Sequence, residues 1–158
     1  MTTPAHQQAR VDQEVASAAR TIRRFGHAVQ FVPGRWQQPS FAYTVGLVGL
    51  GHPELLIFGL DRDTAAAVLN RTCALIRAGR DLIPGEELEI EDWSHRLIVE
   101  DVPNPADILL LANRYYDRPA GSPVAAVQLT YDDRRGRFPW HPGYGLSDWL
   151  QPRPGAFP

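Results

Sequence analysis

Apolar residues follow a helical period in three stretches of the chain. In residues 10–25 they recur every three or four positions, and Gly26 follows as a typical helix end. A second amphipathic stretch covers residues 62–78. A third helix is expected over residues 104–116, because it opens with an Asn-Pro pair, which suits an N-cap and a first helical position.

The other apolar runs are short and typical of β-strands. They cover residues 27–32, 41–47, 54–60, 88–93, 96–102 and 124–131. The run at 54–60 is apolar on both faces, so we expect it to be a central strand. The resulting order, α-β-β-β-α-β-β-α-β, lacks the strict alternation of a doubly wound fold. The pattern therefore predicts a two-layer α+β fold, in which helices pack on a mainly antiparallel sheet.

Length and composition narrow the class of protein. A chain of 158 residues fits one domain, with residues 1–9 and 145–158 expected to be irregular. The formal net charge is −2, so no basic excess marks a binder of nucleic acid or of anionic membranes. The chain has no lysine, which excludes Schiff-base and P-loop lysine chemistry. Without a secretory signal or an apolar run that could span a bilayer, a cytoplasmic protein is expected.

A glycine-rich stretch at residues 46–51 leads into another strand rather than a helix, which favours a flexible loop over a phosphate site. His52 and Glu54 follow it, and a His–carboxylate pair can act as an acid–base couple. The alternative is that Pro53 fixes the turn and His52 faces water. The histidines are scattered and Cys73 is the only cysteine, so no metal site is expected.

The densest aromatic patch lies at residues 137–144, where rings alternate with prolines. Such rings can seal the core as a lid, or they can line a groove for a planar ligand. We expect the lid, with Trp140 mostly buried and His141 on a more exposed side. A binding role would place the ligand or partner on one surface formed by Tyr43, Thr44, the loop at 49–54 and residues 138–141. The candidate ligand-binding residues on it are Tyr43, Thr44, Trp140 and His141.

Several motifs occur in an order that resembles a known family. The specific ones are Phe41-Ala42-Tyr43-Thr44-Val45-Gly46-Leu47 and Arg137-Phe138-Pro139-Trp140, with shorter ones at 53–55, 58–60, 69–70 and 127–129. Together they resemble the bacterial family called domain of unknown function 4262, over about residues 26–143. The family pattern has a tryptophan where this chain has His27 and an aspartate where it has His141. The resemblance implies an α+β fold and no established activity, so the leading hypothesis is a domain that binds a small ligand or a partner.

A second resemblance covers residues 41–76, which look like the corresponding part of flavin-reductase-type split barrels. Those proteins bind FMN as dimers. The resemblance implies an alternative function, namely a flavin- or nucleotide-dependent enzyme that uses His52 and Glu54 as its acid–base pair. A homodimer or a protein partner would fit either hypothesis.

Overall fold

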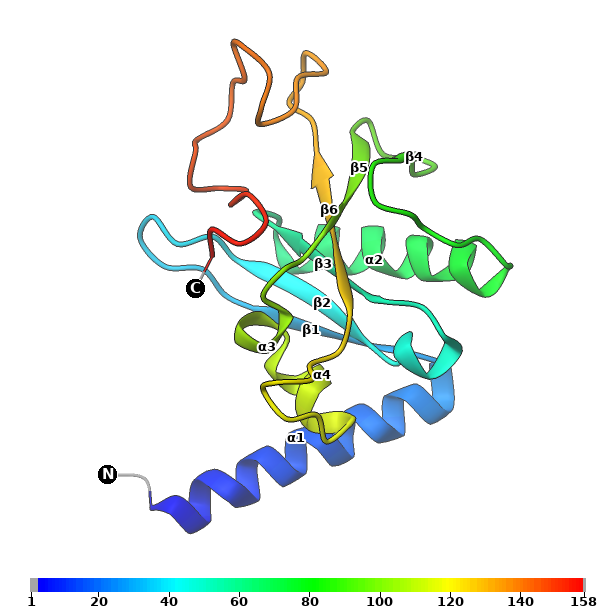
Figure 1. Cartoon of the computed structure of the whole chain (residues 1–158), viewed down its shortest axis with the longest axis vertical. Coiled ribbons are helices and arrows are strands. Elements are labelled where there is room, and N and C mark those ends of the chain that lie inside the picture. The colour runs from blue at the N-terminus through cyan, green and yellow to red at the C-terminus, as the bar shows by residue number, and fades with distance from the viewer. Residues whose placement is uncertain (1–2, 158) are drawn as a thin grey trace.

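The computed structural model describes residues 3–157, which form one six-stranded sheet and four α-helices (Figure 1). The elements are α1 (Pro4–Phe25), β1 (Ala28–Val32), β2 (Phe41–Val45), the short 3-10 helix η1 (Val48–Leu50), β3 (Glu54–Phe58), α2 (Arg62–Arg77), β4 (Glu87–Glu89), β5 (Arg96–Asp101), α3 (Pro105–Ile108), α4 (Leu110–Tyr115) and β6 (Ala126–Tyr131). The strand order is β1-β2-β3-β6-β5-β4. Strands β3 and β6 run parallel, and the other pairings are antiparallel. The predicted α+β class is confirmed, and β3 is central as expected.

Helix α2 covers one face of the sheet, because its apolar stripe meets the alternate strand residues that point toward it. Leu69, which is fully buried, packs in one cluster with Leu55 and Ile57 of β3. The helix begins where the sequence pattern predicts. The Asp61 side chain accepts a hydrogen bond from the N–H of Thr64 at 2.7 Å, which satisfies a donor that the first turn leaves free.

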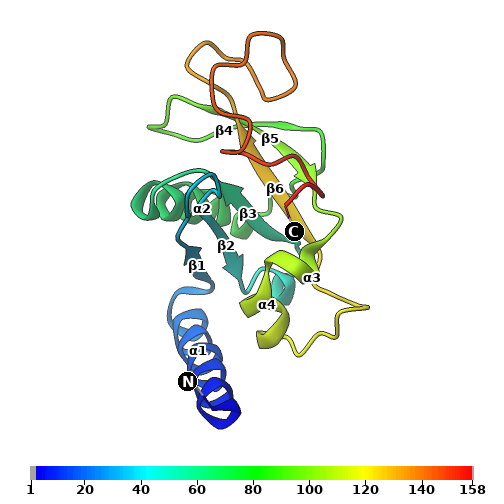
Figure 2. The ribbon, with the colours of Figure 1, turned by 90° about the vertical axis from the view of Figure 1, so that its left-hand side faces the viewer.

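The opposite face of the sheet carries α1, α3 and α4. Leu56 and Phe58 of β3 point to this side and share a cluster with Ala18 of α1 and Leu111 of α4. Figure 2 shows α2 on one side of the strands and α3 and α4 on the other. The sheet therefore lies between two helical layers, one more than the sequence pattern indicates.

Two helices differ from the prediction at their boundaries. Helix α1 begins at Pro4 rather than at residue 10, because the Thr3 side chain caps it and proline suits the first turn. The third predicted helix is divided into α3 and α4 at Leu109, whose backbone leaves the helical region (φ −88°, ψ 61°). The Asn113 amide donates to the carbonyl oxygens of Pro105 and Leu109, which stabilises the break.

The C-terminal tail, residues 137–157, contains neither helix nor strand, yet side-chain amides fix it to the rest of the domain. The Gln151 amide accepts a hydrogen bond from the N–H of Tyr131 at 3.0 Å and donates to its carbonyl oxygen at 2.9 Å, as a neighbouring strand would. The Asn104 amide donates to the carbonyl oxygen of Phe157 at 2.7 Å. These bonds supply ladder partners that the proline-rich tail lacks.

Candidate functional site

The residues that the sequence singles out lie at two ends of the sheet. Glu54 opens β3 and pairs with Ala126 at the start of β6. Residues 138–141 follow the other end of β6, beyond Tyr131 (Figure 1). Because β3 and β6 run parallel, the length of β6 separates the two groups. The structure thus does not join them into the single surface proposed from the sequence.

At the first end, the Glu54 carboxylate is fully buried in a cradle of donors. It accepts hydrogen bonds of 2.8–3.3 Å from the hydroxyl of Thr44 and from the backbone N–H groups of Gly46, Leu47 and Val48. Burial raises the pKa of Glu54 to about 7, and the donated hydrogen bonds oppose that shift. The carboxylate holds the loop that leads into η1, and Gly46 takes the positive φ (125°) that this turn requires.

His52 and Glu54 are hydrogen-bonded to different partners. The His52 Nδ1 lies 2.7 Å from the carbonyl oxygen of Pro53, to which it donates, and its Nε2 accepts the N–H of Leu82 at 3.1 Å. Both ring nitrogens of His52, which is only 6% exposed, therefore have a hydrogen-bond partner in the protein. An acid–base couple needs a free nitrogen, so the flavin-dependent alternative finds no support in this geometry.

Tyr43 and Thr44, two of the candidate ligand-binding residues, lie in the interior. The Tyr43 hydroxyl accepts the N–H of Leu111 at 2.9 Å and so connects β2 to α4. Burial raises the pKa of Tyr43 to about 12. The Thr44 hydroxyl donates to Glu54 and accepts the N–H of Leu55 at 2.9 Å. Both side chains join elements of the fold rather than face a ligand.

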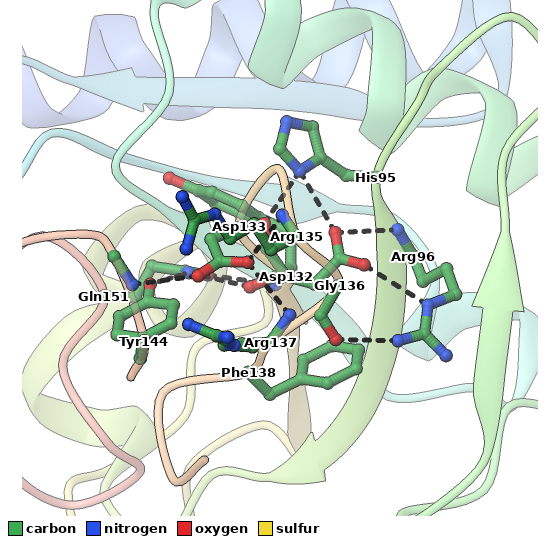
Figure 3. A network of polar contacts seen from close by, with 12 residues as sticks. His95, Arg96, Asp132, Asp133, Arg135, Gly136, Arg137, Phe138, Tyr144 and Gln151 are labelled. Atoms are coloured by element: carbon green, nitrogen blue, oxygen red, sulfur yellow. Dashed lines mark hydrogen bonds and ion pairs between the residues drawn. The ribbon is translucent and has the colours of Figure 1, made fainter. Parts of the chain in front are cut away.

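At the second end, Asp132 connects the end of β6 to the start of β5 (Figure 3). Its Oδ1 lies 3.1 Å from the Nδ1 of His95 and accepts the backbone N–H of Arg96, also at 3.1 Å. Its Oδ2 accepts the Nε–H of Arg96 at 3.2 Å. The Arg96 guanidinium also donates to the carbonyl oxygen of Gly136 at 2.9 Å. One buried carboxylate thereby sets the position of the arginine beside the tail.

Asp133 shapes the following loop from inside (Figure 3). Its Oδ1 accepts the N–H groups of Arg135 and Arg137 at 2.9 Å, and its Oδ2 accepts the N–H of Gly145 at 2.8 Å. These bonds, that of Arg137 foremost, hold the pKa of Asp133 below its usual range. The carboxylate therefore closes residues 133–145 into a compact loop.

A stack of four side chains positions Trp140. The guanidinium of Arg96 lies 5.3 Å from the centroid of the Phe138 ring, and Arg153 lies 4.5 Å from that of Trp140. Phe138 and Trp140 stack on each other, with centroids 5.1 Å apart and planes within 7°. Phe138 is 1% exposed but Trp140 is 43% exposed, so the expectation that Trp140 is mostly buried is wrong. The N–H of His141 donates a hydrogen bond to the carbonyl oxygen of Phe138 at 2.9 Å. In this turn the Phe138 ring points into the interior, and the Trp140 ring packs on its outer side.

His141 is exposed, as expected, and its Nδ1 accepts the N–H of Phe138 at 3.0 Å. The polar residues that support this loop were not among the candidates predicted from the sequence. Asp132 and Asp133 ahead of Gly136 are the signal that was available, because aspartate commonly accepts backbone N–H bonds in turns. No local sequence pattern marks Gln151, because its side chain reaches Tyr131 of β6 only in the folded protein.

Between the stack and the sheet lies a groove of about 550 Å³. It is lined by Pro84, Gly85, Ile98, Val99, Glu100, Asp101, Trp140, Arg153 and Pro154. Arg153 and Glu100 neutralise each other through two hydrogen bonds of 2.6 Å. Asp101 is exposed and has no ion pair within residues 3–157. The residues that border the groove therefore have a formal net charge of −1, with Asp101 at its rim.

The fold and this site define an α+β domain with a preformed groove along strand β5 of its sheet. The chain belongs to the family described as domain of unknown function (DUF4262), whose model matches residues 21–145. The family resemblance of the sequence motifs is thus confirmed. No curated protein and no solved structure matches the chain. In the part of the chain that the structure describes, no helix is long and apolar enough to cross a membrane, and no three His, Cys, Asp or Glu side chains gather as metal ligands would.

Proposed function

We propose that the chain is a binding domain whose groove takes an extended segment of a partner protein that carries an arginine or a lysine. The observation that carries this proposal is that Trp140 is both packed and exposed. Its ring is clamped between Phe138 and Arg153, yet 43% of the residue is exposed at the groove. A large aromatic side chain that is both rigid and accessible is typical of the residues that dominate binding energy.

Rigidity favours binding because the side chains of the groove are ordered before a partner arrives. Trp140 is fixed by the stack, and Arg153 is fixed by its two bonds to Glu100. A partner therefore does not have to order these side chains, which otherwise costs about 0.5–1.5 kcal/mol each. The Trp140 indole N–H has no hydrogen-bond partner within residues 3–157, so it is available to a carbonyl oxygen of an extended chain.

Charge and backbone geometry indicate the kind of partner. Asp101 lies at the rim of the groove and is the charged lining residue without an ion pair within residues 3–157, which favours a cationic side chain in a partner that pairs along this edge. The pairing of β5 continues past β4 to Gly85, whose N–H bonds to the carbonyl oxygen of Val99 at 2.7 Å. Pro84 follows with no N–H, so the ladder ends there. Asp101, two residues beyond Val99, directs its backbone to the same open edge, where an extended segment can pair.

Defined peptides test this proposal. An acetylated Ala-Ala-Arg-Ala-Ala peptide and its Ala-Ala-Glu-Ala-Ala counterpart are titrated into the protein, and tryptophan fluorescence and calorimetry are recorded. We expect the arginine peptide alone to bind. Trp140→Ala and Asp101→Asn should each weaken it at least about tenfold, or about 1.4 kcal/mol. Trp36→Ala is the matched control, because Trp36 is 89% exposed and lies outside the groove.

Two outcomes would contradict the proposal. Equal binding of the two peptides would show that Asp101 selects nothing. The second outcome is that a Trp140→Ala variant, shown by circular dichroism to be folded, binds the arginine peptide as tightly as the wild type. The peptide would then bind outside the groove.

A further inference from the structure

A second cavity lies near the other edge of the sheet, between the end of α1, the start of β1 and the outer side of α2. Its volume is about 480 Å³. It is lined by Thr21, Phe25, His27, Ala28, Val29, Asn70 and Arg77. Strand β1 and strand β5 are separated in the sheet by β2, β3 and β6, so this cavity, the His27 pocket, is distinct from the groove beside Trp140.

His27 organises the pocket from below. Only 8% of the residue is exposed. Its Nε2 lies 2.7 Å from the Oδ1 of Asn70, and because an amide oxygen can only accept, Nε2 carries the proton. Its Nδ1 then accepts a hydrogen bond from the guanidinium of Arg77. Burial lowers the pKa of His27, and the charge of Arg77 acts in the same direction, so the ring is neutral near pH 7.

Arg77 is held in the pocket without a negative partner. It forms no ion pair within residues 3–157. Its guanidinium lies against Gly26, where an added Cβ would come within 3.3 Å of the Cζ atom. His27 engages one of its terminal nitrogens, and most of its five N–H donors have no other partner within residues 3–157. A cation in the last turn of α2 suits the helix dipole, but that role requires neither a buried histidine nor an open cavity.

The other walls complete a site for an anion with an apolar part. The lining contains no aspartate or glutamate. The Nδ2 of Asn70 has no partner within residues 3–157, because Asn70 meets His27 through its oxygen. Phe25 exposes 58% of its surface, and the guanidinium of Arg24 lies 5.2 Å from its ring centroid. Donors, positive charge and an accessible ring thus border one cavity.

We infer that the His27 pocket binds a small anion, a carboxylate or a phosphate monoester, that bears a planar apolar group. Arg77 and the Asn70 amide receive the anionic oxygens, and the Phe25 ring receives the apolar group. His27 is a positioning residue, because it fixes the guanidinium and the amide without facing the anion itself. This inference is independent of the proposed partner groove, and its residues are different.

The test uses phenyl phosphate, benzoate, benzamide and inorganic phosphate as probes, each followed by NMR titration of the whole chain. We expect phenyl phosphate to bind in the millimolar range or tighter, inorganic phosphate more weakly, and neutral benzamide not at all. Arg77→Gln should weaken phenyl phosphate at least about tenfold. Arg80→Gln is the matched control, since Arg80 follows the same helix but does not line the pocket. Phe25→Ala should remove the preference for phenyl phosphate over inorganic phosphate.

A second measurement distinguishes binding in the His27 pocket from nonspecific attraction of anions to exposed arginines. Binding of an anion neutralises Arg77, so the pKa of His27, followed through its ring protons, should rise when phenyl phosphate is added. Equal loss of binding in Arg77→Gln and Arg80→Gln would overturn the inference. No binding by the folded wild-type protein up to about 10 mM phenyl phosphate would do the same.

Discussion

At the start of β3, the Glu54 carboxylate is enclosed by the loop that it holds, whereas beyond β6 Asp132 and Asp133 hold a loop that presents Trp140 to solvent. Both ends use carboxylates to organise backbone N–H groups. The two ends differ in whether the organised loop exposes a side chain to solvent. Polar groups that are buried and satisfied stabilise the fold, while polar groups that rigidify an exposed aromatic ring prepare a binding surface. Sequence patterns do not separate the two uses.

The largest expected effect lies in the tail and shows whether its loop is part of the core. Phe138→Ala should lower the free energy of unfolding by about 3–5 kcal/mol, because a fully buried phenyl ring is removed from the stack. Chemical denaturation measures this change. A loss below about 1 kcal/mol would mean that the loop is only loosely attached to the sheet.

At the other end, Glu54→Ala should lower the free energy of unfolding by about 3 kcal/mol or more. The change leaves three backbone N–H groups of the loop without an acceptor, at about 1–3 kcal/mol for each that stays buried. Glu89→Ala is the control, since Glu89 is exposed on β4 and should change stability by less than about 0.5 kcal/mol. Similar losses in the two variants would remove the contrast between the ends of the sheet.

The pH dependence of stability sharpens the same contrast. In the folded protein the pKa of Glu54 is raised from 4.5 to about 7, so between these values the folded state binds more protons than the unfolded state. Stability from this group is therefore present below pH 4.5 and is lost as the pH rises toward 7, by up to about 3 kcal/mol. Denaturation midpoints between pH 4.5 and 7.5 measure it. Glu54→Gln does not titrate, and a slope that persists in this variant would have to come from another group.

A smaller effect on stability, about 1 kcal/mol, is expected for Trp140→Ala, because the ring is partly exposed and Phe138 is the ring that is buried. Trp36→Ala should change stability by less than about 0.5 kcal/mol. Thermal denaturation of both variants measures the difference. If Trp140→Ala costs as much as Phe138→Ala, the tryptophan is a structural lid rather than a wall of the groove.

The regular elements followed from local patterns. The stripe of α2 and the apolar run of β3 are properties of neighbouring residues, and both were predicted from the sequence. The start of α1 was missed because its first two turns are polar, although Thr3-Pro4 is a suitable N-terminus. The break at Leu109 was missed because neither glycine nor proline marks it, and it depends on Asn113 binding two carbonyl oxygens.

The site was less predictable because its contacts join distant parts of the chain. The aromatic segment at 138–141 was recognised from its composition, but its turn depends on Asp133 and its clamp on Arg96 and Arg153. His52 and Glu54 are close in sequence, yet each binds a different segment. Proximity in sequence was therefore a poor guide to chemistry here. The anchoring of the tail by Gln151 depends entirely on tertiary contacts.

The parallel pairing of β3 with β6 also constrains the order of events during synthesis. Strand β3 is buried along all its residues in the finished sheet, but until β6 has left the ribosome one of its edges has no strand to pair with. Such an apolar edge invites pairing with other chains. A nascent chain that stalls before residue 126 is thus expected to depend on chaperones or to aggregate, because β3 stays unpaired on that edge until β6 is made.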